Sequence, residues 1–287
     1  MSMKSFHSRS QRPAPARPDV RPPPHRASGM LRADALLVAR KLVESRTRAR
    51  ELIEAGLVST ETGTITKPGQ LLSESGQLSV AEDECIRFVS RGTLKLAAAL
   101  ARCGVAASGK TCLDIGESAG GFTDCLLQAG AARVVGVDVG HGQLHPRLHS
   151  DERCVTLEGI NARYLVAEDL GRHMPTTGFD LIVCDASFIS FTLLMPRWPA
   201  LLASGGDILA LVKPQFELDR EALGKGGGVR DPSAYAEVEG RIRAATDTAD
   251  LVVLGWFDSP ILGGGVGNTE GSREFLIWMK HRKHEQD

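Results

Sequence analysis

The residues with the clearest chemical potential close apolar runs of the sequence. Lys213 follows the run ILALV and precedes Pro214, and Asp185 follows the run LIVC. A residue before proline is restricted to extended backbone, so Pro214 helps to fix the direction of the Lys213 side chain. A lysine can act as a general base where its surroundings favour the neutral amine, and a nearby carboxylate can orient it. Lys213 is therefore a candidate binding or catalytic group at the end of a buried strand.

The glycine-rich stretch LDIGESAGGFTD predicts a small-molecule site at a turn from a strand into a helix. Gly116, Gly120 and Gly121 allow the backbone to turn tightly and to approach a ligand at the helix N-terminus. Asp138, at the end of the next predicted strand, is placed to meet ribose hydroxyls. A nicotinamide site prefers G-x-G-x-x-G, whereas this stretch has Asp114 before its first glycine and a longer spacing. The pattern favours S-adenosylmethionine over a nicotinamide cofactor, and comparing the binding of these two ligands would separate the alternatives.

Short apolar segments alternate with helical segments from residue 110 onward, which predicts an α/β fold with a parallel, doubly wound, Rossmann-like sheet. Such a sheet binds its ligand at the carboxyl ends of the strands, the edge where Lys213 and Asp185 are expected. The strand candidates are KTCLDIG, ARVVGVDVG, RCVTLEG, FDLIVCDAS, GDILALVK, ADLVVLGWF and EFLIWMK.

The N-terminal part of the chain has a different composition. Residues 1–29 are rich in arginine and proline and poor in apolar residues, so they predict a disordered basic tail, and without an apolar core segment they are not a secretory signal. Residues 30–88 read as two short helices and a small β-ribbon, which predicts a separate small α+β domain. Arg46 and Arg50 lie one turn apart on the second of these helices.

The bulk composition limits the classes to which the chain can belong. Its 287 residues are 42% hydrophobic with a formal net charge of −1, so it can bury a large core and is not a nucleic-acid binder by overall charge. Six cysteines without a C-x-x-C pair predict buried, reduced thiols and no metal site. No apolar run reaches the length of a membrane span, and we expect a cytoplasmic protein. The oligomeric state is left open.

The small domain is similar to the RNA-binding domain first seen in ribosomal small-subunit protein four. The pattern R-x-D-x-L-L-V, S-R-x-x-A, I-x-x-G-x-V and K-P runs from Arg32 to Pro68, although the usual Val-Asn-Gly turn of the hairpin is replaced here by Thr-Glu-Thr-Gly. The resemblance implies a helix pair and a hairpin that present basic residues to folded RNA. The residues expected to contact RNA are Arg32, Arg46, Arg50, Lys67 and, just before the first catalytic lysine, Arg91.

The motifs of the larger domain occur together in one family. DIGESAGGFTDCLL, VVGVDVGHGQLHPRL, FDLIVCDASFIS, LVKPQFE and GKGGGVRD follow one another in this order. On these motifs the chain resembles the TlyA (haemolysin A-like) ribosomal RNA 2′-O-methyltransferases over residues 31–280, and residues 89–287 are similar to the FtsJ-type catalytic domain. The resemblance implies methyl transfer from S-adenosylmethionine to a ribose 2′-hydroxyl, that of cytidine, in ribosomal RNA or a ribosomal subunit. The residues that it implies for the methyl-donor site are Gly116, Ser118, Gly120, Gly121, Phe122, Asp138, Asn161 and Asp185.

Catalytic domains of the FtsJ type use a lysine–aspartate–lysine–glutamate tetrad, and the resemblance implies Lys95, Asp185 and Lys213 for its first three places. Of these, Lys213 is the expected general base. The family reads G-N-x-E directly before the last strand, whereas this chain reads GNTEGSREFLIW, so two glutamates compete for the fourth place. Glu270 keeps the motif spacing and Glu274 adjoins the strand. We favour Glu274, because the side chain must project from the start of the strand.

Two other functional classes stay open from the sequence. One is a ribosome-associated RNA-binding factor on an inactive methyltransferase fold, and the other is a membrane-active haemolysin, which the lack of a spanning segment or a long cationic helix disfavours. The glycine-rich segment LGKGGGVRD, with Lys225 and Arg230, is either a loop that reaches over RNA or an ordinary surface loop. His141 stands where the family commonly has tyrosine.

Overall fold

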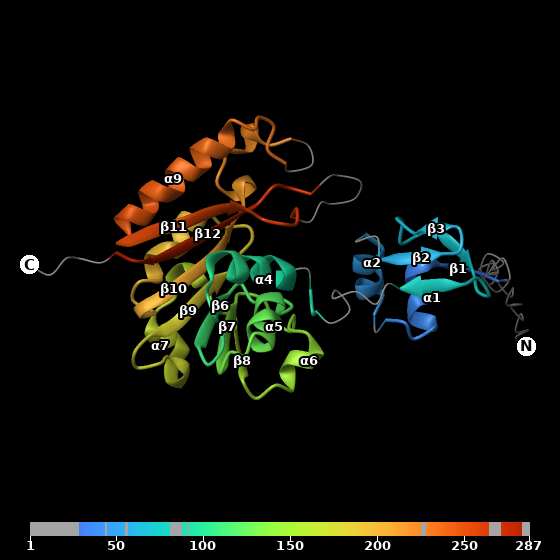
Figure 1. Cartoon of the computed structure of the whole chain (residues 1–287), viewed down its shortest axis with the longest axis horizontal. Coiled ribbons are helices and arrows are strands. Elements are labelled where there is room, and N and C mark those ends of the chain that lie inside the picture. The colour runs from blue at the N-terminus through green and yellow to red at the C-terminus, as the bar shows by residue number, and fades with distance from the viewer. Residues whose placement is uncertain are drawn as a thin grey trace, which may run out of the picture. The chain divides into compact units, whose positions relative to one another are not determined.

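The computed structural model describes residues 29–43, 45–54, 57–80, 88–90, 92–224, 228–263 and 271–282. The chain divides into two compact units, Met1–Glu82 and Asp83–Asp287 (Figure 1). The sequence puts this boundary slightly later, between residues 88 and 89. The expected basic tail lies, except for its last residue, outside the described residues, and so do Arg91, Lys225 and Glu270.

The N-terminal unit packs two helices against short antiparallel strands. The apolar stripes of the helices, with Leu36 and Leu37 on the first and Leu52 and Ile53 on the second, are buried and form its core. Strand β1 pairs with β4, and β2 lies between β3 and β5, so the predicted ribbon is in fact two small sheets. The elements are β1 (Met30–Arg32), α1 (Ala33–Ala39), α2 (Arg46–Glu54), β2 (Val58–Thr60), β3 (Gly63–Thr64), β4 (Leu71–Ser73) and β5 (Leu78–Val80).

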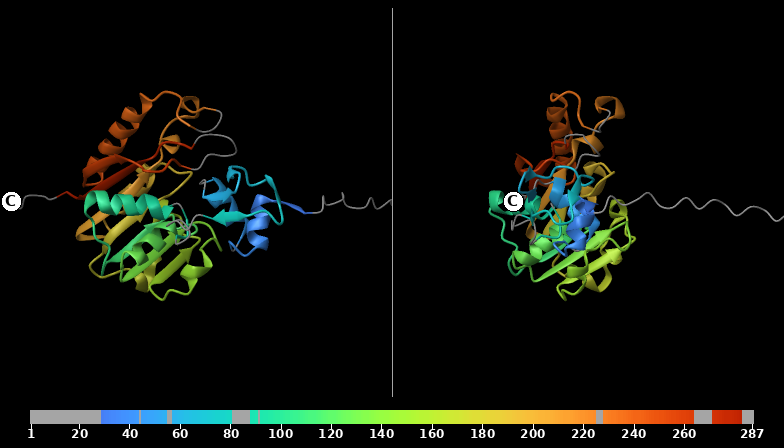
Figure 2. Two further views of the ribbon diagram at one scale, coloured as in Figure 1. Left: turned by 45° about the vertical axis from the view of Figure 1, so that its right-hand side comes forward. Right: turned by 90° about the vertical axis from the view of Figure 1, so that its right-hand side faces the viewer.

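The C-terminal unit is built on one seven-stranded sheet with the order β11-β12-β10-β9-β6-β7-β8 (Figures 1 and 2). Each predicted strand is present. The strands are β6 (Thr111–Ile115), β7 (Arg133–Asp138), β8 (Cys154–Glu158), β9 (Phe179–Cys184), β10 (Leu202–Val212), β11 (Leu251–Asp258) and β12 (Phe275–His281). The strands β10, β9, β6, β7 and β8 pair parallel, as expected for a Rossmann-like sheet.

The expectation of a parallel sheet is wrong at one edge. Strand β12 pairs antiparallel with both β10 and β11, with Val212 opposite Phe275 and Asp258 also opposite Phe275. The connection from β11 to β12 contains no crossover helix in its described part, so the chain turns back and inserts β12 between its two neighbours. As a result the beginning of β12, not its end, lies at the carboxyl edge of the parallel strands.

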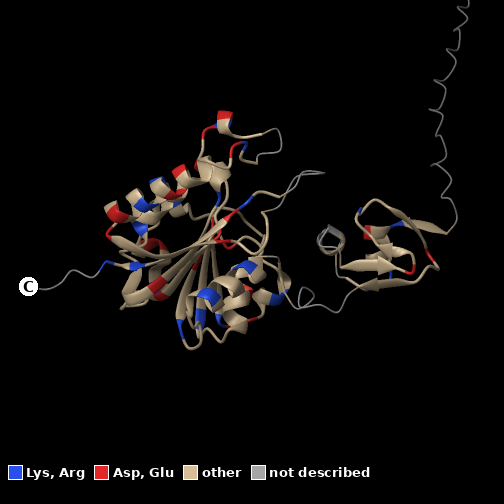
Figure 3. Cartoon of the chain, turned by 45° about the horizontal axis from the view of Figure 1, so that its top comes forward, with Lys and Arg blue, Asp and Glu red and all other residues tan. Residues whose placement is uncertain are grey.

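Helices cover both faces of this sheet. Alternate strand residues point to opposite faces, so Leu113 and Ile182 pack with α8 and α9, while Cys112 and Leu181 pack with α4 and α5. The outer face of α9 carries both signs of charge, including i,i+4 pairs, as a solvated helix face does (Figure 3). The helices are α4 (Gly92–Cys103), α5 (Gly121–Gln128), α6 (Pro146–His149), α7 (Ala167–Leu170), α8 (Phe191–Leu194) and α9 (Ala234–Thr248).

Within the described part of the chain, no helix is long and apolar enough to cross a membrane. The same residues contain no group of three or more His, Cys, Asp or Glu side chains that could hold a metal ion.

Candidate active site

Four charged residues meet at the carboxyl edge of the sheet. Asp185 directly follows β9, Lys213 directly follows β10, and Glu274 directly precedes β12. Because Val212 pairs with Phe275, the next residues along the two strands, Lys213 and Glu274, also face each other across the sheet edge. Lys95 comes from the first half of α4, which packs on this part of the sheet.

These residues form two ion pairs, each between a lysine and a carboxylate. Lys95 Nζ lies 2.6 Å from Glu274 Oε2, and Lys213 Nζ lies 2.6 Å from Asp185 Oδ1. The side chains of Lys95, Glu274 and Lys213 are at most 10% exposed, whereas that of Asp185 is 22% exposed. Burying two charge pairs costs more free energy in lost hydration than a surface ion pair contributes. Their burial is therefore unfavourable for stability alone and points to a role in a reaction. The structure thus places the four residues expected for the tetrad, including Glu274, at one edge of the sheet, whereas Glu270 lies outside the described residues.

Lys213 has further partners that the sequence did not predict. Its ammonium group donates to Ser187 Oγ at 2.7 Å and to the carbonyl oxygen of Asp185 at 3.3 Å. Ser187 and Phe188 belong to the loop that follows β9, and Phe188 has a positive φ of 64°, which turns the chain sharply there. The ring of Phe188 is 91% exposed and contacts that of Phe216, with 5.3 Å between the ring centroids.

Glu217 holds the far end of the same loop. Its buried carboxylate accepts hydrogen bonds from Ser190 Oγ and from the backbone N–H of Phe191, each at 2.6 Å. These bonds cap α8 and tie the loop after β9 to the turn after Lys213. In the sequence Glu217 is the last residue of the motif LVKPQFE, but the motif does not indicate its partner, which lies 27 residues away.

A cavity of about 520 Å³ opens beside Asp185 at this edge. Its wall is formed by the loops that follow β6, β7, β8 and β9, as expected for a ligand site of a doubly wound sheet. Gly116 is essential to its shape: φ is +81°, and a Cβ there would lie 3.0 Å from the Cα of Ala186. The predicted residues on the wall are Gly116, Ser118, Asp138, Asn161 and Asp185.

Hydrogen bonds fix the wall of the cavity before any ligand binds. Asp138 accepts from the backbone N–H groups of Ser118 at 2.8 Å and Gly140 at 2.7 Å, one on each carboxylate oxygen. The hydroxyl of Ser118 donates to the side-chain oxygen of Gln143 at 3.1 Å. Each oxygen of Asp138 keeps a second lone pair, so the carboxylate can still accept from the hydroxyls of a ligand.

The structure places Gly120, Gly121 and Phe122 away from the wall of this cavity. A Cβ on Gly120 would collide with Leu148, and Phe122 is only 3% exposed in the core between α4 and α5. These residues therefore affect the shape of the ligand site only indirectly. They let α5 pack closely on its neighbours, and this packing positions the loop that carries Gly116 and Ser118.

Beneath the glycine-rich loop lies a buried cluster of two carboxyl groups. The hydroxyl of Thr123 lies 2.8 Å from Asp114 Oδ2 and 3.0 Å from Glu117 Oε1. Burial raises the pKa of Asp114 well above its ordinary value, and the nearby Glu117 raises it further; burial likewise raises the pKa of Glu117. The loop therefore rests on carboxyl groups that favour their neutral form, which lowers the cost of burying them.

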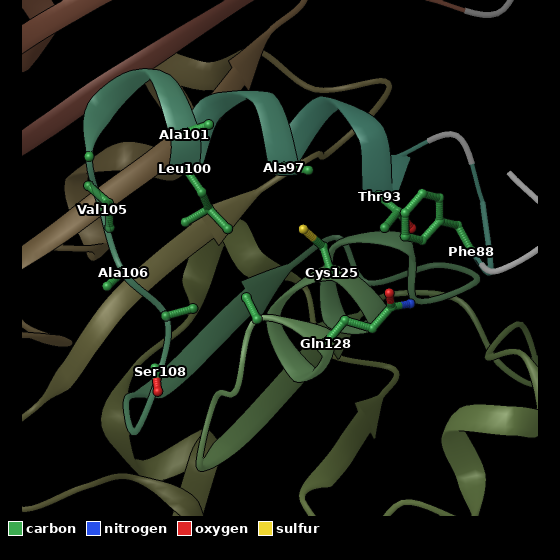
Figure 4. A pocket seen from close by; sticks show the side chains of 13 residues that line it. Phe88, Thr93, Ala97, Leu100, Ala101, Val105, Ala106, Ser108, Cys125 and Gln128 are labelled. Atoms are coloured by element: carbon green, nitrogen blue, oxygen red, sulfur yellow. The ribbon is translucent and has the colours of Figure 1, made fainter. Parts of the chain in front are cut away.

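A second cavity, of about 580 Å³, lies between α4, the segment after it and α5 (Figure 4). It is slightly larger than the cavity beside Asp185, but small apolar side chains dominate its lining, and its polar members are Thr93, Ser108, Cys125 and Gln128. None of the residues that line it is an acid, a lysine, an arginine or a histidine. This cavity is the larger of the two, but the charged residues that could take part in a reaction lie beside the other one.

Three of the arginines expected to contact RNA gather around one buried carboxylate in the N-terminal unit. Asp34 is fully buried and lies 3.1 Å from Arg32, 2.8 Å from Arg46 and 3.4 Å from Arg50. Burial raises the pKa of Asp34, but hydrogen bonds from Arg32 and Arg46 outweigh it and hold the pKa well below its ordinary value. The three arginine side chains remain about half exposed, so their charge is oriented by Asp34 and open to solvent. Lys67 is exposed in the same unit.

Residues 88–281 match the family model of the FtsJ-like methyltransferases. The chain belongs to the FtsJ-like methyltransferase family. It is similar to the 16S/23S rRNA (cytidine-2′-O)-methyltransferase TlyA of Mycobacterium tuberculosis, with 40% identity over 249 residues, which cover 87% of this chain and 89% of that protein. It is also 37% identical over 247 residues to the protein named Hemolysin A of Brachyspira hyodysenteriae, covering 86% of this chain and all of that one.

A solved structure from Streptococcus thermophilus, provisionally titled a hemolysin, supports the same grouping. It superposes with a TM-score of 0.67 at 37% identity and covers 89% of this chain and 90% of that chain. The resemblance to TlyA and to FtsJ-type enzymes inferred from the sequence motifs is confirmed by these relatives, and so is the Rossmann-like methyltransferase fold. The protein is a methyltransferase.

Proposed function

We propose that this chain transfers a methyl group from S-adenosylmethionine to the ribose 2′-hydroxyl of a cytidine in ribosomal RNA. The observation that carries this proposal is the pair of lysine–carboxylate contacts, Lys95–Glu274 and Lys213–Asp185, beside a cavity walled by Gly116 and Asp138. The acceptor class follows the TlyA relative, which is named as a (cytidine-2′-O)-methyltransferase. Ribosomal RNA as substrate implies that the enzyme works in the cytoplasm.

The cavity fits the proposed methyl donor. Its volume of about 520 Å³ lies within the usual range of small-ligand sites, roughly 300–1,000 Å³. Asp138 offers carboxylate lone pairs for ribose hydroxyls, and the apolar side chains of Val137, Ile160 and Ala162 give a surface for a nucleobase. When bound, S-adenosylmethionine would supply an electrophilic methyl group on a sulfonium. Asp185, on the wall of the cavity, would help to orient the reacting groups.

The charged residues would position the weak nucleophile and manage its proton. A ribose hydroxyl is very poorly acidic, so its attack needs close alignment with the methyl group and removal of the proton. Lys213 is proposed as the base, with Asp185 to stabilise the ammonium form that results. Lys95 and Glu274 would hold the ribose by hydrogen bonds, and because they are paired they add no net charge to the site.

The surfaces around the site suit a splayed RNA nucleotide. Phe188 presents an almost fully exposed ring next to the residues that contact Lys213, and such a ring can stack on an unstacked base. In the N-terminal unit, Arg32, Arg46 and Arg50 are oriented for phosphate contacts by their shared pairing with Asp34. Lys67 and Arg91 are proposed for the same role by resemblance alone.

The decisive experiment is the transfer of labelled methyl from S-adenosylmethionine to separated ribosomal subunits. We expect label on the ribose of a cytidine with the wild-type chain and a loss of about 100-fold or more with Lys213→Ala, the scale of general-base catalysis. Lys280→Ala is the matched control and should retain wild-type activity, since Lys280 pairs with Asp207 in the middle of strand β10 and not with the residues at its carboxyl end. Binding of RNA without any transfer would instead support an inactive RNA-binding factor.

A further inference from the structure

Lys213 does not line the cavity into which the methyl donor fits. Among the described residues, the wall of the 520 Å³ cavity includes Asp185, Ala186, Ser187 and Phe188, but not Lys213. Lys213 lines a neighbouring space of about 10 Å³, which shares Ala186, Ile189 and Leu194 with the wall of the large cavity. This volume is at the lower limit for a single water molecule. Its side chain is 9% exposed. In this structure Lys213 is therefore not part of the wall that faces a ligand in the large cavity.

Ser187 connects the large cavity to Lys213. It is exposed and lies on the wall of the large cavity, and its Oγ is 2.7 Å from Lys213 Nζ. A serine hydroxyl has one proton and two lone pairs, so it can contact an ammonium or amine on one side and a second hydroxyl on the other. In this structure it accepts from Lys213, which leaves one lone pair and its own proton for other partners.

The loop that carries Ser187 is held at several points. The backbone N–H of Asp185 donates to the carbonyl of Ile115 at 3.1 Å, the Phe188 ring contacts Phe216, and Glu217 holds the end of the loop. A side chain on a loop fixed in this way keeps its distance from Lys213, as catalytic hydrogen bonding requires.

We propose that Ser187 is a further catalytic residue, which carries the proton of the ribose 2′-hydroxyl to Lys213. This role rests on the proposed function. The 2′-oxygen releases its proton to Ser187 Oγ, and Ser187 releases its own proton to the neutral amine of Lys213. The 2′-oxygen forms its bond to the methyl carbon as the carbon–sulfur bond breaks with its electron pair going to sulfur. One positive charge thus leaves the sulfonium and one appears on Lys213.

The contacts in the structure match the end of this step. Lys213 as an ammonium donates to Ser187 Oγ and lies 2.6 Å from the carboxylate of Asp185, which stabilises the new charge. Before the next turnover the ammonium has to release a proton, and Ser187 offers the route to solvent because it is the exposed neighbour of a buried amine.

The test compares Ser187→Thr with Ser187→Val. These side chains have nearly the same shape, and only threonine keeps the hydroxyl. We expect Ser187→Thr to retain at least about a tenth of the wild-type rate and Ser187→Val to lose about 100-fold or more relative to Ser187→Thr, the range of general acid–base effects. The dissociation constants for S-adenosylmethionine and for the ribosomal subunit should agree within about threefold between the two variants, because neither ligand needs this hydroxyl for binding.

A proton inventory in mixtures of H₂O and D₂O supplies an independent readout. Two protons move in the proposed step, so the wild-type rate of the chemical step should curve with the deuterium fraction, whereas direct transfer to Lys213 gives a straight line. Equal rates for Ser187→Thr and Ser187→Val, or a straight line, would overturn the role of Ser187. A wild-type chain that methylates no ribose would instead overturn the proposed function, before any variant is compared.

Discussion

The buried pair of Lys95 and Glu274 allows catalysis and stability to be separated by experiment. Their charged atoms lie 2.6 Å apart, and their side chains are 10% and 3% exposed. Gly263 lies so close to the Glu274 side chain that only an unbranched replacement is suitable there. We therefore consider Lys95→Met, Glu274→Met and the double variant, since methionine is linear and adapts to irregular spaces.

Each single variant leaves a buried charge without its partner. Breaking a buried pair in this way costs about 3–5 kcal/mol of unfolding free energy. We expect about 3 kcal/mol, the lower end of that range, because Lys95 is already partly exposed and its long side chain can reach water. Replacing both members by apolar residues of similar volume is often neutral or stabilising. The double variant should therefore stay within about 1 kcal/mol of the wild type on the same reasoning, yet transfer no methyl group.

Urea unfolding followed by tryptophan fluorescence measures these differences in the larger unit alone. The chain has three tryptophans, Trp198, Trp256 and Trp278, and all lie within Asp83–Asp287. The midpoint should shift while the slope with urea stays constant. A double variant as unstable as the two single variants would refute the reasoning, because the pair would then stabilise the fold in its own right. An active double variant would remove the pair from the catalytic site.

Two further predictions concern other charged groups. Burial raises the pKa of Glu117, so its contribution to stability is complete below the ordinary carboxyl pKa of about 4.3 and is lost as the pH rises through the folded-state value. The Glu117→Gln side chain cannot ionise, so in urea unfolding from pH 5 to 8 the stability of this variant relative to the wild type should increase with pH. A difference that stays constant with pH would contradict the raised pKa of the buried carboxyl. Replacing Arg46 and Arg50 by alanine should lower the slope of log affinity for rRNA against log salt by about 0.7–0.9 per lost phosphate contact, while Arg243→Ala on α9 should leave it unchanged; equal slopes in all variants would exclude these arginines from phosphate contact.

The sequence predicted the parts of the fold that local pattern determines. All seven strands appear as apolar runs, and the glycine-rich turn after β6 forms one wall of the cavity. Both could be predicted because the type of a residue determines its tendency to be buried and its backbone freedom. The antiparallel insertion of β12 could not be read in the same way. An apolar run has no direction in its composition, and the pairing of Val212 with Phe275 depends on a connection without a crossover helix in its described part.

The residues of the candidate site that the family resemblance implies could be predicted from the sequence. Residues that join the site only through the three-dimensional fold were harder to predict. Glu274 was preferred to Glu270 because it adjoins a strand, and the structure brings it to Lys95. Ser187 and Glu217 lie within two of the quoted motifs, but their contacts were missed, since polar residues in loops have no periodicity and their partners are distant in sequence. Phe122 was expected in the donor site and instead packs in the core, because a motif does not show which member faces the ligand.

The distribution of charge separates binding from chemistry. The four charged residues at the sheet edge sum to zero, since each lysine is paired with a carboxylate. When Lys213 is the neutral base, the site carries one net negative charge, which favours the sulfonium donor. The proton that Lys213 accepts brings the sum to zero, so no positive net field holds RNA phosphates there. In the N-terminal unit, by contrast, three arginines share the single charge of Asp34, which leaves an excess of positive charge near solvent. Affinity for RNA is therefore expected to fall with salt through the N-terminal unit, whereas the buried pairs, which salt screens weakly, keep the transfer step itself nearly independent of it.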